Sequence, residues 1–416
     1  MSSDAEWYLN SLKYNKPGAI PHDFATVVED GCPFDCGLCP EHQQHTCVGL
    51  IEITTRCNLA CPICFANAGP GYDLSVAQVE AMLDRFIETE GQPEVLQISG
   101  GEPTIHPQLL DILAAAKARD IRHLVLNTNG LRLAQDPDFV RELSLYRPFI
   151  YLQFDGVSAQ TYENLRGQDL RNIKRQALDH LAEAGLYAAL VATIVQGVNE
   201  NEIGEILRCG LEHPSVLGVC YQPVTYAGRC LNHHDPLHRV TLPQVLHDLE
   251  KQTEGLFMVK DFRPVPCPHP TCSASTYAYV DDKQVMPLTR LLDVDDYLDF
   301  VTNRALVDAS AVIKPVLEAL WSMAAVMGSE KTTNNLTCVA CNLNLNLPSS
   351  IDSLVEHFFS VHVHGFMDAH NLDLKRLMKC CIHQLLPDGR AVPFCAYNTL
   401  GYREQVRQEQ EALVDR

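Results

Sequence analysis

Short runs of β-branched and other apolar residues alternate with longer amphipathic segments between residues 48 and 225. The runs predict six strands, at 48–55, 94–101, 121–130, 149–156, 187–197 and 216–224. The segments between them carry apolar residues at three-to-four spacing, the period of a helix with one buried face. Such repeats predict right-handed βαβ units around a parallel sheet. A closed barrel of this type has eight units, so we predict a partial (β/α)6 barrel of the α/β class, spanning 48–225.

Residues suited to helix ends mark the helical segments of this core. Ser75 precedes VAQVEAMLDRFIETE as an N-cap, and Pro107 opens PQLLDILAAAKARD at a favoured first-turn position. Gly185 ends NIKRQALDHLAEAG, as glycine commonly does after a last helical turn. These signals support helices between the predicted strands.

The sequence outside the core divides into three further regions. Residues 1–47 contain four cysteines and no long periodic segment, which indicates a metal-binding segment. Residues 226–303 are rich in His, Pro and Asp and are interpreted as an irregular connection that includes the motif CPHPTC. Residues 304–416 combine an apolar helical stretch at 304–327, a further group of cysteines and a polar helical tail.

Two histidines in the last region alternate with valines, in VHVHGF at 361–366. The alternation predicts that His362 and His364 lie on one face of a strand. Hydrogen-bonded or exposed histidines explain this pattern without a further metal site, so we assign these two residues no role.

Composition and charge exclude several classes of protein. The chain has 416 residues, of which 46% are hydrophobic and 20% charged, as in a folded globular protein. Its formal net charge of −20 disfavours nucleic acid as a partner, because binding phosphates needs basic surface. No apolar run is long enough for a transmembrane segment, and MSSDAEWYLN lacks the features of a secretory signal. We expect a cytoplasmic protein, with peripheral contact to a membrane left open.

Cysteine is the unusual component, with seventeen residues. A cytosolic chain keeps its thiols reduced, so a disulfide scaffold is not expected. The odd number and the tight clustering indicate that most of these thiols bind metal.

Three cysteines follow the first strand of the core in RCNLACPICFA, where Cys57, Cys61 and Cys64 have the spacing C-x3-C-x2-C. A cubane iron–sulfur cluster has four irons, so three thiolates leave one iron open to an outside molecule. A structural zinc loop is the alternative, but it needs a fourth ligand close by. The spacing therefore favours a [4Fe-4S] cluster with an open iron.

The second strand ends in GGEPT at residues 100–104. This motif, the cysteine motif and the six strand–helix units together resemble the radical S-adenosylmethionine (radical SAM) superfamily. The resemblance implies that S-adenosylmethionine chelates the open iron and is cleaved, by one electron, to methionine and a 5′-deoxyadenosyl radical. This radical would abstract hydrogen from an unactivated C–H bond, and the expected electron donor is ferredoxin or flavodoxin.

The resemblance also implies which residues surround S-adenosylmethionine. The methionine amino group would meet the turn formed by Gly100, Gly101, Glu102 and Pro103, where two glycines suit close approach of a ligand. Arg166 would contact the carboxylate, although an exposed helical arginine is the alternative. Val195, with Gly197, would flank the adenine, although a buried strand residue explains Val195 equally well.

Polar residues also close the third and fourth strands, where parallel folds collect ligand-binding groups. They are Asn127, Thr128 and Asn129 after the third strand and Gln153 and Asp155 after the fourth. Asn and Asp beside Gly are good turn formers too, so a purely structural role stays open.

The N-terminal thiols Cys32, Cys36, Cys39 and Cys47 have the number that one tetrahedral ion requires. We predict a mononuclear site that holds zinc or a rubredoxin-like iron. The first three repeat the C-x3-C-x2-C spacing, so a second open-iron cluster is the alternative, but the fourth thiol favours a closed site.

The remaining clustered cysteines predict two auxiliary iron–sulfur clusters. They are Cys267, Cys272, Cys338, Cys341, Cys380, Cys381 and Cys395. Two cubanes need one ligand more, which His269, His383 or Cys230 could supply. The isolated Cys209 and Cys220 are interpreted as buried apolar residues.

Several segments narrow the resemblance to the archaeal tetraether synthase and pterin-methylase-like group. They are the tandem cysteine motifs, CPHPTC, HGFMDAHNLDLKRLMKCC and LPDGRAVPFCAYN. This likeness implies C–C bond formation on lipid alkyl chains, for which the apolar stretch at 304–327 could line a groove. The alternatives are methylation of a pterin-like small molecule, modification of a peptide by a radical maturase, and a non-catalytic metal scaffold that would not need GGEPT.

Overall fold

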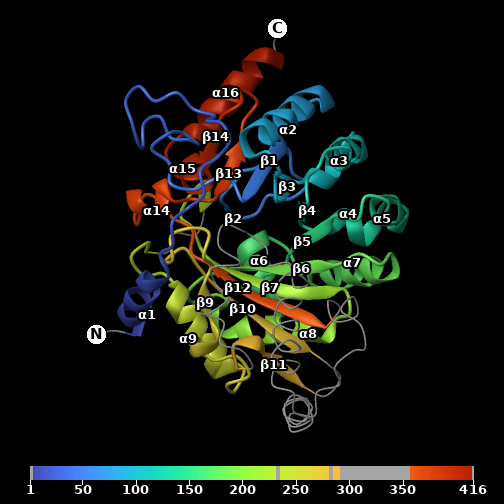
Figure 1. The fold of residues 1–416 in the computed structure, drawn as a ribbon. Coiled ribbons are helices and arrows are strands. Elements are labelled where there is room, and N and C mark those ends of the chain that lie inside the picture. Colours follow the sequence, from blue (N-terminus) through green and yellow to red (C-terminus); the bar gives the residue numbers. More distant parts are fainter. Residues whose placement is uncertain (1–2, 231–234, 281–283, 291–356, 415–416) are drawn as a thin grey trace, which may run out of the picture.

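The computed structural model describes residues 3–230, 235–280, 284–290 and 357–414. Within them, one curved sheet runs through the molecule, with most helices along its outer side (Figure 1). The apolar stretch at 304–327 and the predicted ligands Cys338 and Cys341 lie outside the described residues.

All six predicted core strands are present. They are β1 (Val48–Thr54), β3 (Val95–Gly100), β4 (His123–Thr128), β5 (Phe149–Gln153), β6 (Ala188–Ile194) and β7 (Val216–Pro223). Each is parallel to its neighbours, in the order β7-β6-β5-β4-β3-β1. The predicted partial barrel of the α/β class is therefore confirmed.

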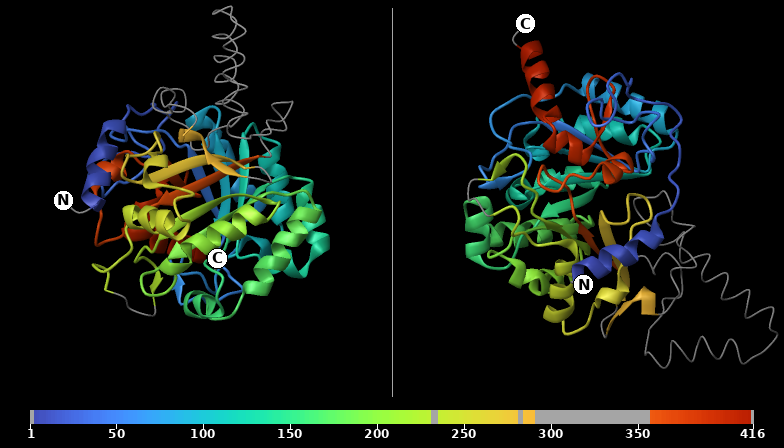
Figure 2. Two further views of the ribbon diagram at one scale, coloured as in Figure 1. Left: turned by 90° about the horizontal axis from the view of Figure 1, so that it is seen from below. Right: turned by 90° about the vertical axis from the view of Figure 1, so that its left-hand side faces the viewer.

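Helices between these strands cover the convex face of the sheet (Figures 1 and 2). They are α2 (Val76–Glu90), α3 (Leu109–Lys117), α4 (Leu131–Gln135), α5 (Pro137–Ser144), α6 (Ala159–Arg166), α7 (Arg171–Glu183) and α8 (Ile203–Glu212). Ser75 caps α2 as predicted, and its hydroxyl accepts a hydrogen bond from the Gln78 backbone N–H. The main apolar core lies between these helices and the sheet.

Further strands extend the sheet at both edges. Beside β7, the strand β12 (Phe358–His364) runs parallel and is followed by antiparallel β10 (Ser273–Val280) and β11 (Val285–Pro287), while β9 (Arg263–Pro264) also pairs with β10. Beside β1, the strand β13 (Ile382–Leu385) runs parallel and pairs with antiparallel β14 (Ala391–Pro393). The predicted strand that carries His362 and His364 is confirmed.

The interpretation of residues 226–303 as irregular connection was wrong for the described part of that region. It contains α9 (Leu242–Gln252) and β10, in addition to short strands. The sequence of β10, SASTYAYV, alternates small polar with small apolar residues, so its hydrophobic contrast is weak. Its partner β12 lies far along the chain, and this pairing cannot be read from a local pattern.

The two ends of the chain pack together beside β1 and β13. The blue N-terminal segment and the red C-terminal elements lie side by side in Figures 1 and 2. The Leu38 N–H donates to the Ala391 carbonyl (2.8 Å), and the Gln43 N–H donates to the Met378 carbonyl (2.7 Å). The helices of this region are α14 (Leu374–Met378), α15 (Phe394–Thr399) and α16 (Tyr402–Val414), whereas α1 (Ser3–Ser11) lies beside α9 (Figure 1).

One buried arginine fastens α16 to the core. Arg403 is 1% exposed, forms an ion pair with Glu52 on β1 and donates to the Ala66 carbonyl at 3.4 Å. Arg407, one turn along α16, donates to the Ala66 carbonyl at 2.7 Å and to the Asn67 carbonyl at 3.2 Å. The C-terminal helix therefore holds the backbone just after Cys64.

Replacing Arg403 with Met is expected to destabilise the protein strongly, because Glu52 would keep a buried charge without its partner. The expected loss is about 3–5 kcal/mol in the free energy of unfolding, measured by anaerobic denaturant titration. Arg208→Met breaks the exposed pair of Arg208 with Glu205 and should cost less than about 1 kcal/mol. Equal losses in the two variants would contradict the anchoring role of Arg403.

Candidate functional site

The loop after β1 brings the three cysteines of the core motif together. Cys57, Cys61 and Cys64 are free thiols that pack around Leu59 and Tyr162. Burial raises the pKa of Cys57 to about 12 and also raises the pKa of Cys61. Buried thiols release their protons only beside positive charge, which a metal centre supplies. The loop is thus suited to a metal centre that binds all three sulfurs.

Polar groups from distant elements fix the backbone of this loop. Arg166, at the end of α6, donates to the Ile63 carbonyl at 3.1 Å. Arg229 of β8 (Arg229–Cys230) donates to the Cys61 carbonyl at 2.7 Å, and β8 itself pairs with β2 (Ile63–Cys64). Each bond gives a carbonyl of this loop a side-chain hydrogen-bond donor.

The two glycines of GGEPT allow close contact between β3 and β1. A Cβ on Gly100, whose φ is 137°, would lie 2.2 Å from the Thr54 carbonyl oxygen, and one on Gly101 would lie 2.1 Å from that of Arg56. The structure gives these glycines a reason that the sequence analysis did not consider, and close approach of a ligand stays a prediction. The backbone that a Cβ would strike is the chain's own, immediately before the cysteine loop.

The carboxylate of Glu102 is committed to the protein. It is 1% exposed and accepts hydrogen bonds from the Thr104 N–H (3.0 Å) and hydroxyl (2.6 Å), the Thr128 hydroxyl (2.8 Å) and the Asn129 N–H (2.7 Å). Its side chain therefore ties the carboxyl end of β3 to that of β4. Pro103 follows it as the first residue of the short helix η2 (Pro103–Ile105).

Asn129 joins this turn to the cysteine loop. Its side-chain amide donates to the Asn58 side-chain oxygen at 2.7 Å, next to Cys57. Asn127, two residues earlier, faces a different group, accepting from Gln97 (2.6 Å) and donating to Ser99 (3.2 Å). Asn129 thus contacts the cysteine loop, whereas Asn127 contacts side chains of β3.

Asp155 and Arg166 form a buried ion pair beside the loop. Nε and Nη2 of Arg166 each donate to Asp155 at 2.7 Å, and Nη2 also donates to the Thr193 hydroxyl at 3.2 Å. The side chain of Arg166 is 10% exposed and that of Asp155 is fully buried. The alternative of an exposed helical arginine is excluded, and most of the guanidinium donors are committed to protein.

Val195 lies immediately after β6 and is 1% exposed. It packs against Ile63 of the cysteine loop and Leu165 of α6. The Val195 N–H donates to the Asn199 side chain at 2.8 Å. Val195 thus lies beside the cysteine loop in a small apolar cluster, and its expected contact with the adenine stays a prediction.

Sequence reasoning missed Lys174 on α7. Its ammonium group is fully buried and donates to the Asn129 carbonyl (2.6 Å) and to the Gln153 side chain (2.9 Å). Burial lowers the pKa of Lys174 to about 7. A lysine on the apolar stripe of a helix was the available signal, since Ala177, Leu178 and Leu181 share its buried face.

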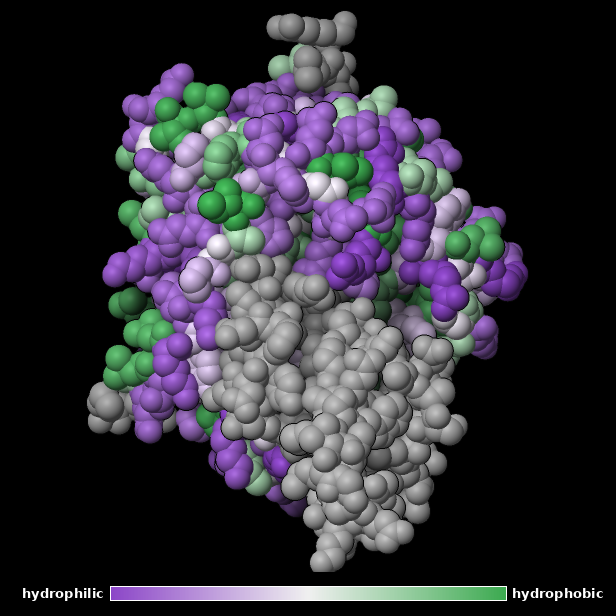
Figure 3. All heavy atoms as spheres, viewed as in Figure 1, coloured by the Kyte–Doolittle hydropathy of each residue, from purple (hydrophilic) through white to green (hydrophobic). Residues whose placement is uncertain are grey.

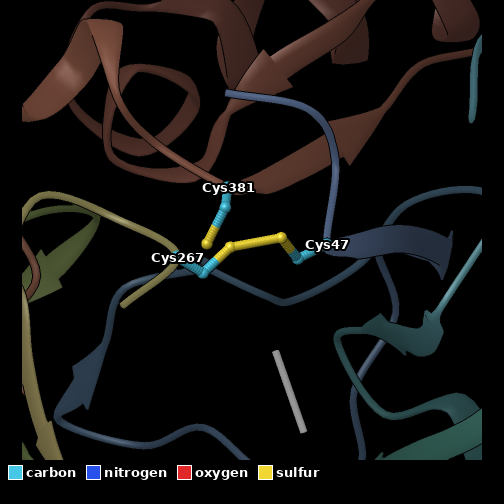
Figure 4. A group of neighbouring side chains, drawn as sticks. All are labelled: Cys47, Cys267 and Cys381. Carbon is cyan, nitrogen blue, oxygen red and sulfur yellow. A yellow bond between two sulfur atoms is a disulfide. The ribbon is translucent and has the colours of Figure 1, made fainter. Parts of the chain in front are cut away.

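The structure does not place Cys47 with the other N-terminal thiols. Cys47 forms a disulfide with Cys267, and the sulfurs of Cys47, Cys267 and Cys381 all lie within 4.8 Å of one another (Figure 4). The predicted four-thiolate site that included Cys47 is therefore corrected. The physical reason is topological, since residues 47 and 48 enter β1 beside β13, which begins just after Cys381.

The other three N-terminal thiols do line one small cavity. Its lining includes Cys32, Cys36, Cys39 and His42. Burial raises the pKa of Cys36, and nearby thiols, including Cys380, raise it further. Three of the four predicted ligands are thus gathered, with Cys380 rather than Cys47 beside them.

Cys272, Cys380 and Cys395 are neighbours in the structure. Burial raises the pKa of Cys380, and the nearby Cys395 and Cys272 raise it further. Cys272 accepts a hydrogen bond from Arg376 at 3.3 Å, and Cys395 accepts one from the Met367 N–H at 3.3 Å. Thiols from three distant segments therefore converge near the start of β13.

Comparisons with known proteins decide the family. A model described as the radical SAM superfamily matches residues 51–209. The 7,8-dihydro-6-hydroxymethylpterin dimethyltransferase of Methanocaldococcus jannaschii is 34% identical over 98% of this chain and 87% of its own length. This chain belongs to the radical SAM superfamily.

Two other matches cover about half of the chain. Mycofactocin maturase MftC of Mycobacterium ulcerans is 26% identical over 47% of this chain and 52% of its own length. The structure of Streptococcus suis SuiB bound to the precursor peptide SuiA aligns with a TM-score of 0.40 and 17% identity, over 51% of this chain and 46% of that chain.

Membership of the radical SAM superfamily identifies the chain as an enzyme that uses a [4Fe-4S] cluster and S-adenosylmethionine, with a reductant and a substrate. The residues present fit the cluster, since one loop offers three free thiols and a cubane has four irons. No helix in the described part of the chain is long and apolar enough to cross a membrane.

Replacing Lys174 with Met is expected to weaken S-adenosylmethionine binding about tenfold, because Asn129 and Gln153 lose the donor that fixes them. Stability should change by less than about 1.5 kcal/mol, since the variant also removes a buried amine. Anaerobic calorimetry on the reconstituted protein measures the affinity. Lys117→Met, on the exposed end of α3, is the matched control, and unchanged affinity in the Lys174 variant would contradict the positioning role.

Proposed function

We propose that this radical SAM enzyme generates a carbon-centred radical on a small, polar heterocycle of the pterin class and thereby directs its methylation. Cys57, Cys61 and Cys64 would hold the [4Fe-4S] cluster. When bound, cluster and S-adenosylmethionine together supply a one-electron cleavage that yields methionine and a hydrogen-abstracting 5′-deoxyadenosyl radical. A ferredoxin or flavodoxin is the proposed electron donor.

The described side chains have defined tasks in this proposal. The turn at Gly100 and Gly101 would receive the methionine amino group through its backbone, because the Glu102 carboxylate is already occupied by internal hydrogen bonds. The remaining donor of Arg166 would face the methionine carboxylate. Val195 would border the adenine from the apolar cluster it shares with Ile63.

The observation that carries the substrate class is the polarity of the sheet face opposite the helices, here called the inner face. Side chains alternate along each strand, and the apolar residues of β3 to β7 and of β12 that join the main core point toward the helices. The opposite positions near the carboxyl ends of the strands are mostly polar, and include Gln97, Ser99, Asn127, Gln153, Thr193, Gln222, His362 and His364. Three less polar residues lie among them, Val125 beside Gln97, and Val191 and Cys220 beside Gln153.

A polar inner face favours a ring with hydrogen-bonding edges over a methylene chain. An alkyl chain laid against amides and imidazoles would remove their water without offering hydrogen bonds, at a cost of about 1–3 kcal/mol per group. Figure 3 shows the outer surface of the molecule, where hydrophobic residues of the described part are likewise scattered among hydrophilic ones. Coupling of lipid alkyl chains, the first expectation from sequence, therefore becomes the second candidate.

Similarity to known proteins also favours a pterin-like substrate. The pterin dimethyltransferase match spans 98% of this chain, whereas the maturase match spans 47%. A relative's activity does not transfer by identity alone, so the inner face remains the main argument.

We further propose that the C-terminal thiols hold auxiliary iron–sulfur clusters. The sulfurs of Cys47, Cys267 and Cys381 lie within reach of one metal centre, which Cys47 and Cys267 would bind as reduced thiolates in place of their disulfide. The Cα atoms of this pair are 7.6 Å apart, beyond the usual range for a disulfide. Cys272 and Cys395 offer two further thiols that are neighbours of each other, while Cys380 is assigned below to the N-terminal site. Because Cys338 and Cys341 are also predicted ligands, the full ligand sets include residues outside the described part.

The N-terminal site is proposed as a mononuclear iron or zinc centre with a revised fourth ligand. Cys32, Cys36 and Cys39 line one cavity, and Cys380 is close enough to raise the pKa of Cys36. His42, in the same cavity, contacts the Cys380 carbonyl through Nε2 at 2.7 Å. A fourth thiolate would complete a tetrahedral site of the usual kind.

The substrate proposal predicts selective stimulation of S-adenosylmethionine cleavage. The anaerobically reconstituted protein is incubated with reductant, S-adenosylmethionine and, separately, 6-hydroxymethyl-7,8-dihydropterin, a long-chain diether lipid or an unrelated cysteine-containing peptide. The pterin should raise 5′-deoxyadenosine formation at least tenfold over the substrate-free rate. With pterin deuterated at its C–H positions, deuterium should appear in 5′-deoxyadenosine.

The incubations with lipid and with peptide test the two alternative functions. Stimulation and deuterium transfer with the lipid alone would support alkyl-chain chemistry and overturn the pterin assignment. Stimulation by the peptide alone would favour a maturase. The Cys57→Ala variant serves as the background, because it lacks one of the three proposed cluster ligands.

A further inference from the structure

His362 and His364 are adjacent on the inner face at the carboxyl end of β12. Phe359, Val361 and Val363 point into the main apolar core, so both histidines lie on the opposite side of the strand. Their rings stack with centroids 6.0 Å apart and planes 6° from parallel. Because β12 is parallel to β7, the pair lies at the same end of the sheet as the cysteine loop.

These histidines have few partners of their own. Nδ1 of His362 lies 2.7 Å from the Ser275 hydroxyl on β10, and the His362 ring meets the edge of Tyr277. Both nitrogens of His364 and Nε2 of His362 lack a hydrogen-bond partner among the described residues. The only other ring that stacks on His364 is Phe366, as far as the described residues show.

Their environment makes them neutral groups. Burial lowers the pKa of His362 to about 3, with a contribution from His364, and lowers the pKa of His364 to about 4. A neutral imidazole offers one donor and one acceptor. Both side chains are half-buried, so their unpartnered nitrogens are open to water or to a ligand. A ligand that displaces such water binds well only if it replaces the hydrogen bonds.

A metal ion is not the favoured occupant of this pair. Among the described residues, the one group of three side chains with metal-binding spacing is that of Cys47, Cys267 and Cys381. The neighbours of the histidines are a hydroxyl and aromatic rings. These groups suit the edge and face of a flat, uncharged ring.

We propose that His362 and His364, with Ser275, form the subsite that binds the hydrogen-bonding edge of a neutral planar heterocycle. The inference rests on the proposed function and deepens it, since it names the residues that select the substrate. The two imidazoles offer donors and acceptors to ring nitrogens and carbonyl oxygens, while Tyr277 and Phe366 border the same space. The subsite lies on strands that sequence analysis did not connect to the core.

The test compares variants that keep or remove the ring nitrogens. His364→Phe keeps an aromatic ring for stacking and removes both nitrogens, and His362→Phe does the same at the neighbouring position. His364→Gln keeps a donor and an acceptor. His247→Phe is the matched control, because His247 is exposed on α9.

The measurement is binding of 6-hydroxymethyl-7,8-dihydropterin to the anaerobically reconstituted enzyme, followed by pterin fluorescence. Substrate-free cleavage of S-adenosylmethionine and iron content are measured on the same samples. Each Phe variant should bind the pterin about tenfold more weakly, the glutamine variant should bind within about threefold of wild type, and the control should be unchanged. Substrate-free cleavage and iron content should be equal in all four variants.

The outcomes separate this inference from the proposed function. If wild type binds the pterin and the Phe variants bind it with the same affinity, the subsite is overturned and the pterin proposal stays intact. Absence of pterin binding by wild type, with intact substrate-free cleavage, would overturn both. If a Phe variant also lost iron, His364→Gln would be compared with wild type instead. A glutamine variant that keeps its iron but binds the pterin more than tenfold more weakly would contradict the hydrogen-bonding role.

Discussion

Hydrogen bonds from arginine side chains to the carbonyls of the cysteine loop are the interaction on which the rest of the site depends. Arg229, Arg166 and Arg407 reach the carbonyls of Cys61, Ile63 and Ala66 from β8, α6 and α16. Without these donors the loop would expose unsatisfied carbonyls inside the protein. Three thiols can share one metal centre only while their backbone is held in this way. The arginines also bring positive charge to a loop whose ligands must be anionic.

The same constraint explains why remote parts of the chain belong to one structure. α16 is the last helix of the chain, yet Arg403 pairs with Glu52 on the first core strand. The thiols before β10 and before β13 meet Cys47 at the start of β1. The Arg403 pair joins α16 to β1, whereas these thiols gather at the start of β1, the opposite end of the strand from the cysteine loop. The strands added at the edges of the barrel therefore bring metal-binding residues to the amino ends of β1 and β13, and inner-face residues to the carboxyl end of β12.

The sequence was sufficient for features with a local signature. The core strands, the Ser75 cap, the cysteine loop and the alternation of His362 with His364 all follow from short-range patterns. The partner of Cys47 does not, because it depends on which strand pairs with β1 on its far side. The task of Glu102 was also hidden, since its hydrogen-bond donors include Thr128 and Asn129 from the next strand. The features that could not be predicted from the sequence depend on contacts between distant parts of the chain rather than on residue type.

The most direct test of the account is iron and acid-labile sulfide per chain after anaerobic purification, in wild type and in a variant with Cys57, Cys61 and Cys64 all changed to alanine. We predict that the variant loses about four irons and four sulfides, because one cubane leaves. About eight of each should remain in the auxiliary clusters, with one further iron if the N-terminal site holds iron. A wild type with about four irons in all would remove the auxiliary clusters from the account. A triple variant that retained all its iron and sulfide would contradict its central claim, that these three thiols hold a cluster.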